Sequence, residues 1–152
     1  MYDGLNQINT LGRLDFARTT VVAIREWLQS GLVLRPDDAA LQRELSVSHE
    51  KVGDVLVAQG QLGAALEAYT ASRTIRERLA SQDPHNAQWQ RDLSFSHMNF
   101  GHTLAKQDQR LESLASLAQA REISARLVQH DPSNAVWKND LAWVEQQIAK
   151  LS

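Results

Sequence analysis

Apolar residues recur along the chain with the spacing of an α-helix. Two stripes lie on either side of Gly60 and consist of Leu41, Leu45, Val52 and Leu56, then of Leu62, Leu66, Tyr69, Ile75 and Leu79. Residues separated by three, four or seven positions share one face of a helix, so each stripe can be buried against a neighbouring helix. The pattern predicts a pair of amphipathic helices with Gly60 as the turn residue between them.

The same periodicity predicts an all-α protein. We expect helices near residues 14–33, 38–58, 62–81, 86–106, 110–129 and 134–151, with a partial helix near 3–10. The sequence Asp83-Pro-x-Asn86 follows one helix pair, and Asp131-Pro-x-Asn134 follows the next. Proline cannot continue a helix and asparagine is a favoured N-cap, so both sequences predict the end of one helix and the start of another.

The prolines reveal an internal repeat. Pro36, Pro84 and Pro132 are evenly spaced, since 84 − 36 = 48 and 132 − 84 = 48. When residues 41–88 are aligned with residues 89–136 without a gap, 19 of the 48 positions are identical, whereas unrelated sequences would share about three. The chain therefore contains a duplicated unit of two helices.

The repeat sets the expected domain organisation. We expect one domain over residues 1–152, with a degenerate repeat at 1–40, full repeats at 41–88 and 89–136, and a C-terminal capping helix at 137–152. Gly12 and Val21 support the degenerate repeat because they lie one repeat period before Gly60 and Tyr69.

Composition argues against several classes of protein. The chain has 16 Lys and Arg against 18 Asp and Glu, a net charge of −2 and no run of one sign, so it lacks the basic surface that nucleic-acid binding requires. Its apolar stretches are shorter than the roughly 20 residues that span a bilayer, and residues 1–3 do not begin a signal peptide. We expect no nucleic-acid partner, no membrane association and a cytoplasmic location. The absence of cysteine removes thiol nucleophiles and Cys-ligated zinc.

The repeat resembles the tetratricopeptide repeats (TPRs), whose signature is W-x2-L-G-x2-Y, A-x3-F and P. His49-x2-Val52-Gly53-x2-Leu56, Gly60, Ala65-x3-Tyr69 and Pro84 fall in this register. The period of 48 exceeds the usual value of about 34 residues, so the chain is similar to a long-period type common in bacterial multidomain proteins. The resemblance implies a right-handed α-solenoid of antiparallel helix pairs, in which Gly53 and Gly101 let the paired helices approach closely.

Candidate catalytic and metal-binding residues do not form a convincing set. His97 and His102 are five residues apart, which turns them about 140° from one another on a helix, unlike the i, i+4 pair that binds zinc. The carboxylates of Glu50 and Asp54 share a helix face and could pair in acid–base chemistry, but a polar or partner-binding face is favoured because no orienting partner accompanies them. We expect no metal, no cofactor and no enzymatic activity.

The family resemblance also implies where a partner would bind. In TPR proteins the first helix of each pair lines the concave surface, and the residues that contact a ligand recur at the same positions from repeat to repeat. We call these positions the ladder. By register, the ladder of this chain consists of Val47, Glu50, Asp54, Phe95, Met98, His102, Trp143, Gln146 and Lys150. The ladder runs from acidic to basic and carries large apolar side chains, which are typical anchors at interfaces.

These residues lead to two hypotheses about function. The first is a module that binds a protein or peptide of basic or mixed charge with apolar anchors. The alternative is a self-assembling, spacer or sensor segment of a larger bacterial signalling protein, for which a homo-oligomer is one form.

Overall fold

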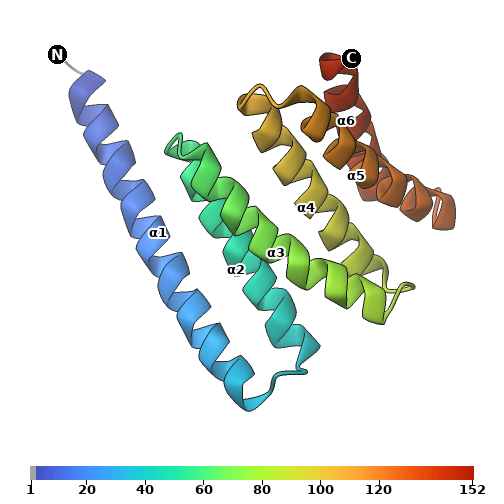
Figure 1. The fold of residues 1–152 in the computed structure, drawn as a ribbon, viewed down its shortest axis with the longest axis horizontal. Helices are drawn as coiled ribbons and strands as arrows, with labels where there is room; N and C mark the ends of the chain where they lie inside the picture. The colour runs from blue at the N-terminus through green and yellow to red at the C-terminus, as the bar shows by residue number, and fades with distance from the viewer. Residues whose placement is uncertain (1–2) are drawn as a thin grey trace. The chain divides into compact units, whose positions relative to one another are not determined.

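The structure, a computed structural model, describes residues 3–152, and the side chains of residue 10 and of residues 12–152. Over these residues it is all-α, as predicted, and contains no strand (Figure 1). The helices are α1 (Asp3–Leu34), α2 (Ala39–Ala58), α3 (Leu62–Gln82), α4 (Ala87–Lys106), α5 (Arg110–His130) and α6 (Ala135–Leu151). In the described part of the chain, no helix has the length and apolar character needed to cross a membrane.

The predicted interruption near Gly12 was wrong, because α1 continues through it and merges the expected helices at 3–10 and 14–33. A single glycine weakens a helix by about 1 kcal/mol but does not end it unless a proline or capping residue adds to the effect. Gly60, at the equivalent repeat position, does form a turn and has a φ of +75°. The turn at Gly60 was therefore predicted correctly, whereas the chain makes no turn at Gly12.

Three N-caps recur with the period of the repeat. The side-chain oxygens of Asp38, Asn86 and Asn134 accept hydrogen bonds from the backbone N–H groups of Leu41, Trp89 and Trp137, at 3.0, 3.1 and 3.1 Å. Each cap satisfies a backbone donor that the helix itself cannot pair, a contribution of about 1 kcal/mol. The two asparagine caps confirm the prediction, and an aspartate performs the same role in the first repeat.

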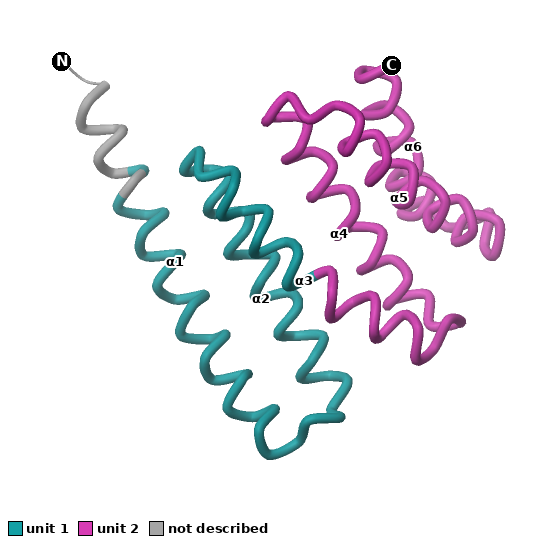
Figure 2. Tube along the Cα trace, in the orientation of Figure 1, with its two compact units in different colours: residues 1–72 teal, residues 73–152 magenta. Residues whose placement is uncertain are grey.

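The chain forms two compact units, residues 1–72 and residues 73–152, shown in different colours in Figure 2. The division lies within α3 and therefore within the repeat at 41–88. In unit 1, the buried side chains include Leu28, Leu45, Val52, Leu56 and Tyr69. In unit 2, a core of Met98, Leu117, Ala120 and Val144 is flanked by Phe95, Leu141, Ile148 and Leu151.

Gly53 and Gly101 lie where two helices cross closely, as the TPR resemblance implies. A Cβ atom added to Gly53 would lie 2.6 Å from Cδ1 of Tyr69 in α3, and one added to Gly101 would lie 2.9 Å from Cγ of Leu117 in α5. Neither position has room for a larger residue. The glycines thus set the separation of α2 from the start of α3, and of α4 from α5.

Buried serines form a second link between α4 and α5. The hydroxyls of Ser113 and Ser116 donate to the backbone carbonyls of Gly101 and His97, at 2.7 and 2.9 Å. Ser94 donates in the opposite direction, to the carbonyl of Ala120 at 3.1 Å. These small side chains satisfy their own polar groups at the interface while keeping the two helices close.

Candidate functional site

Helices α4 and α6, whose sequences lie one repeat period apart, line a groove in unit 2. It has a volume of about 290 Å³ and is lined by Phe95, Met98, Asn99, Asn139, Asp140 and Trp143. Three of the residues predicted to contact a partner, Phe95, Met98 and Trp143, lie together in this groove. Phe95 and Trp143 are equivalent repeat positions, since 143 − 95 = 48, so the repeat itself brings the two aromatic side chains to one site.

The apolar residues of the groove differ in exposure. Trp143 is 37% exposed and forms part of the wall, whereas the neighbouring Val144 is fully buried. Phe95 is half-buried and packs against the core of unit 2. The Trp143 side chain is therefore accessible to a ligand, whereas the Phe95 side chain is held in place by the core of unit 2.

Met98 does not occupy the exposed position that the sequence suggested. Its side chain is only 3% exposed because it packs with Leu117, Ala120 and Val144 in the core of unit 2. Ala120 is small and leaves room for the longer methionine. Met98 therefore forms part of the floor of the groove and is not a projecting anchor.

The polar side of the groove is largely balanced in charge. Arg91 Nε donates to Asp140 Oδ2 at 2.7 Å, and the same guanidinium lies 4.8 Å from the centroid of the Phe95 ring. This arrangement combines an ion pair with a cation–π contact and fixes the ring of Phe95. Asn99 and Asn139 each add an amide that can both donate to and accept from a peptide backbone.

His102 and Trp143 are in contact beside the groove, with ring centroids 6.1 Å apart and an angle of 57° between the planes. Burial lowers the pKa of His102, and the positive charges of Lys106 and Lys150 lower it further. The imidazole is therefore neutral at pH 7, and the positive charge at this end comes from the two lysines. Lys150 and its neighbour on the predicted ladder, Gln146, are both exposed on α6.

The ladder residues of unit 1 differ from those of unit 2, because the carboxylate of Asp54 is bound by other side chains of unit 1. Its Oδ1 accepts a hydrogen bond from the Tyr69 hydroxyl at 2.9 Å, and its Oδ2 lies 3.0 Å from Lys51 Nζ. Lys51 also lies 3.8 Å from Glu50, and Val47 is half-buried. Burial raises the pKa of Tyr69, and the nearby carboxylates of Asp54 and Glu50 raise it further.

Sequence reasoning missed the role of Asp54 as the partner of a buried tyrosine. The two residues lie 15 apart on different helices, and only the close approach at Gly53 brings them together. A signal was present, because an aspartate one residue after the crossing glycine coincides with tyrosine in place of leucine at residue 69. The contact between Asp54 and Tyr69 can be inferred from that coincidence only when the pairing of α2 with α3 is known.

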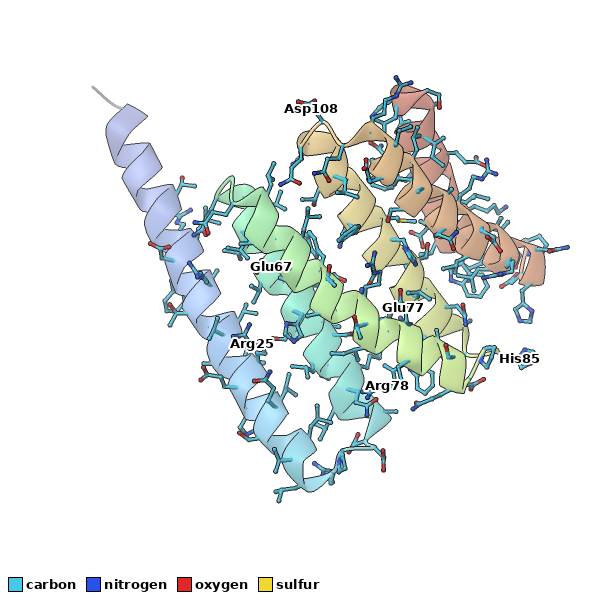
Figure 3. All side chains as sticks on the ribbon, viewed as in Figure 1. Arg25, Glu67, Glu77, Arg78, His85 and Asp108 are labelled. Atoms are coloured by element: carbon cyan, nitrogen blue, oxygen red, sulfur yellow. The ribbon has the colours of Figure 1, made fainter. Side chains whose placement is uncertain are left out.

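Two other histidines occupy equivalent structural positions. Burial lowers the pKa of His49, and the positive charge of Arg25 lowers it further. In the same way, burial and, to a smaller extent, the positive charge of Arg73 lower the pKa of His97 to about 4. Arg25, marked on α1 in Figure 3, and Arg73 are one repeat period apart, as are the histidines. Among the described residues, no three potential His, Cys, Asp or Glu ligands come together in a way that could hold a metal ion.

The chain matches no protein-family model, and no curated protein matches it.

Proposed function

We propose that this chain is a non-catalytic module that binds a peptide or protein segment in the groove between α4 and α6. The observation that carries the proposal is the meeting of Phe95, Met98 and Trp143, which the repeat register selects, in one hollow of about 290 Å³. Clustered aromatic and methionine side chains are frequent among residues that dominate binding energy. The paired helices offer no exposed strand edge, so a ligand would bind through side-chain contacts and the two asparagine amides.

We further propose that the helix pairs belong to a TPR-like, right-handed α-solenoid. Recurrence supports this interpretation: the N-caps, the crossing glycines and the arginine–histidine neighbours each return after one repeat period. Repetition of contacts, and not only of sequence, is characteristic of repeat proteins in which each unit packs on its neighbour.

The groove favours a ligand of mixed charge. Its centre is apolar, the Asp140 carboxylate is paired with Arg91, and Lys106 and Lys150 provide positive charge near His102. A large apolar side chain would fit beside Trp143, with an acidic group towards the lysines. A purely basic partner, selected by Glu50 and Asp54, is less well supported because Lys51 and Tyr69 already engage these carboxylates.

Methyl NMR can test the groove directly because the chain has only two methionines, Met1 and Met98. Peptides selected from an unbiased displayed library would be titrated into protein carrying ¹³C-labelled methionine methyl groups. We expect selected peptides to contain a large apolar residue and to shift the Met98 signal while leaving the Met1 signal in place. Saturable peptide binding without a change at Met98 would move the site elsewhere, and failure to select any peptide would favour a spacer role.

Variants provide the matched control. Trp143→Ala should weaken binding of the selected peptides by at least about tenfold, as expected when an aromatic side chain that contacts the ligand is truncated. Leu111→Ala truncates an exposed apolar residue on α5 that does not line the groove, so it should leave affinity unchanged. Equal losses in both variants would contradict a specific groove.

A further inference from the structure

Helix α1 packs against α2 but exposes apolar residues on another face. Ile24 is 49% exposed, Trp27 is 71% exposed and Leu34 is also exposed, whereas Leu28 is buried. Residues 24, 27 and 34 follow the spacing of one helix face. Exposed apolar groups arranged in this way mark an interaction surface.

The repeat register shows what kind of surface this is. A shift of two repeat periods places Thr20, Ile24 and Trp27 on Ser116, Ala120 and Ile123 of α5. In unit 2 these α5 positions face α4. Ser116 donates to the His97 carbonyl, Ala120 shares a core with Met98, and Ile123 lines a hollow with Gln90 and Ala87. The exposed face of α1 is thus the face on which a first helix packs elsewhere in the chain.

Helix α6 carries the complementary face. It is itself a first helix, and a shift of one repeat period places Ser94, His97, Met98 and Gly101 of α4 on Ala142, Glu145, Gln146 and Ala149. All of these α6 residues are exposed, although the equivalent α4 residues are covered or contacted by α5. Two alanines on this face keep it flat enough for close helix packing.

We infer that α6 of one copy docks on α1 of a second copy, as α4 packs on α5. The occupant is a second copy because the two exposed faces are the two halves of one repeat, present in the same chain and in the same register. Ala149 would lie against Val21, as Gly101 lies against Leu117. Ala142 would lie against Ile24, as Ser94 does against Ala120.

Two further pairings are chemically compatible. The Thr20 hydroxyl donates to the Phe16 carbonyl at 3.0 Å in the single chain, and on docking it can rotate to donate to the Glu145 carbonyl, as Ser116 does to His97. Lys138 takes the position of Gln90, which lies near Ile123, and would therefore place its aliphatic stem and ammonium group over the Trp27 indole. The interface has an apolar centre and a charged rim.

This contact joins two different faces, so it is heterologous. An assembly of any length still has one free α1 face and one free α6 face. The assembly can therefore continue to grow unless the rotation between successive copies closes a ring. The docking does not depend on the α4–α6 groove, and its variants avoid the groove residues.

Sedimentation velocity of the whole chain over about 10 μM to 1 mM provides the test. We expect wild-type protein to form species larger than a dimer as concentration rises. Trp27→Glu destroys the α1 face and Ala149→Arg destroys the α6 face, and each should weaken self-association by at least about tenfold. Mixed together, the two variants retain one intact face each and should form a 1:1 heterodimer that does not grow.

Phe16→Glu is the matched control. Phe16 is also on α1 and is 76% exposed, but its repeat equivalent, Glu112, is exposed on α5. This variant should associate like wild type. Circular dichroism melting of each variant separates loss of docking from loss of folding.

Three outcomes would overturn the inference. They are a wild-type monomer across the whole range, as expected if some other partner covers the α1 face; a closed dimer that survives Ala149→Arg, as expected for α1 packing on α1; and failure of the mixed variants to associate.

Discussion

The two glycine crossings show how one repeat position can serve two purposes. In unit 1, Gly53 lies against Tyr69, and the tyrosine hydroxyl is held by Asp54. In unit 2, Gly101 lies against Leu117, which has no hydroxyl to satisfy. The position equivalent to Asp54 is His102, which contacts Trp143 beside the groove. The crossing is retained, whereas the residue after the glycine changes from a structural partner into part of a candidate binding surface.

The difference has a simple physical origin. A buried phenol requires a hydrogen-bond partner, because leaving it unpaired costs about 1–3 kcal/mol. Once tyrosine fills the crossing in unit 1, its neighbour must supply an acceptor and is no longer available to select a ligand. Leucine makes no such demand in unit 2. Repeat register therefore predicts where a side chain lies better than it predicts what the side chain does.

Enlarging the crossing glycines should have the largest effect. Gly53→Leu and Gly101→Leu would drive a side chain into Tyr69 and Leu117, and overpacking of this kind costs about 1–3 kcal/mol or more. Gly53→Leu should be the more damaging because the rigid tyrosine ring crowds the site from several atoms. Midpoints of urea unfolding would measure both.

Gly63→Ala is the control for these substitutions. Gly63 lies in α3 with no other atom near the place of a Cβ, so alanine there should stabilise the helix by about 0.5–1 kcal/mol. A destabilised Gly63→Ala, or tolerated leucines at the crossings, would contradict the helix packing described above.

Acid should weaken the protein through the histidine near the unit 2 crossing. Burial and the charge of Arg73 lower the pKa of His97 from 6.5 to about 4, so the unfolded chain binds a proton below pH 6.5 that the folded chain does not. The free energy of unfolding should fall as pH drops from about 6.5 to about 4. The full shift corresponds to about 3 kcal/mol, and solvent screening of the partly exposed ring reduces our expectation to about 1–2 kcal/mol.

His97→Gln should flatten this part of the stability profile. The comparison variant is His85→Gln, which changes an exposed histidine in the α3–α4 loop, marked in Figure 3. An unchanged slope for His97→Gln between pH 4 and pH 6.5 would assign the acid sensitivity to other groups.

Asp54 and His102 should respond differently to the same truncation. Asp54→Ala removes the acceptor of the Tyr69 hydroxyl and should lower the free energy of unfolding by about 1 kcal/mol. His102→Ala removes an exposed ring at the groove and should change stability by less than about 0.5 kcal/mol. Peptides selected for groove binding should lose affinity for the His102 variant and not for the Asp54 variant, and the reverse pattern would restore the binding role first assigned to Asp54.

Much of the fold could be predicted from the sequence because its signals are local or periodic. The N-caps at Asn86 and Asn134 follow from a proline and a capping residue in sequence, and the close crossings at Gly53 and Gly101 were implied by the TPR resemblance. The continuous α1 could not be predicted from the repeat register. Gly12 is equivalent to Gly60 in that register, yet the helix continues through Gly12.

The site was harder to predict because its chemistry depends on neighbours distant in sequence. Phe95 and Trp143 could be brought together by the repeat period alone. The burial of Met98 depends on the small Ala120, and the role of Asp54 depends on Tyr69. The exposure of a residue on a helix depends on which neighbouring helix packs against it. The periodic pattern of the helix itself does not contain that information.

Substitutions in the two helix turns should have small effects on stability, with opposite signs. Gly60 and Asp108 are equivalent positions, have φ values of +75° and +59°, and close the α2–α3 and α4–α5 turns; Asp108 is marked in Figure 3. Left-handed backbone costs glycine nothing and costs an L-residue about 1 kcal/mol, although aspartate tolerates it better than most. Gly60→Ala should therefore destabilise the protein by about 1 kcal/mol. Asp108→Gly should stabilise it by about 0.5–1 kcal/mol, reduced by the extra conformational entropy that glycine gives the unfolded chain.

Thermal melting of the two single variants and the double variant would measure both effects, and near-additivity is expected because the turns belong to separate units. A destabilising Asp108→Gly would show that the aspartate side chain contributes more to its turn than its backbone strain removes.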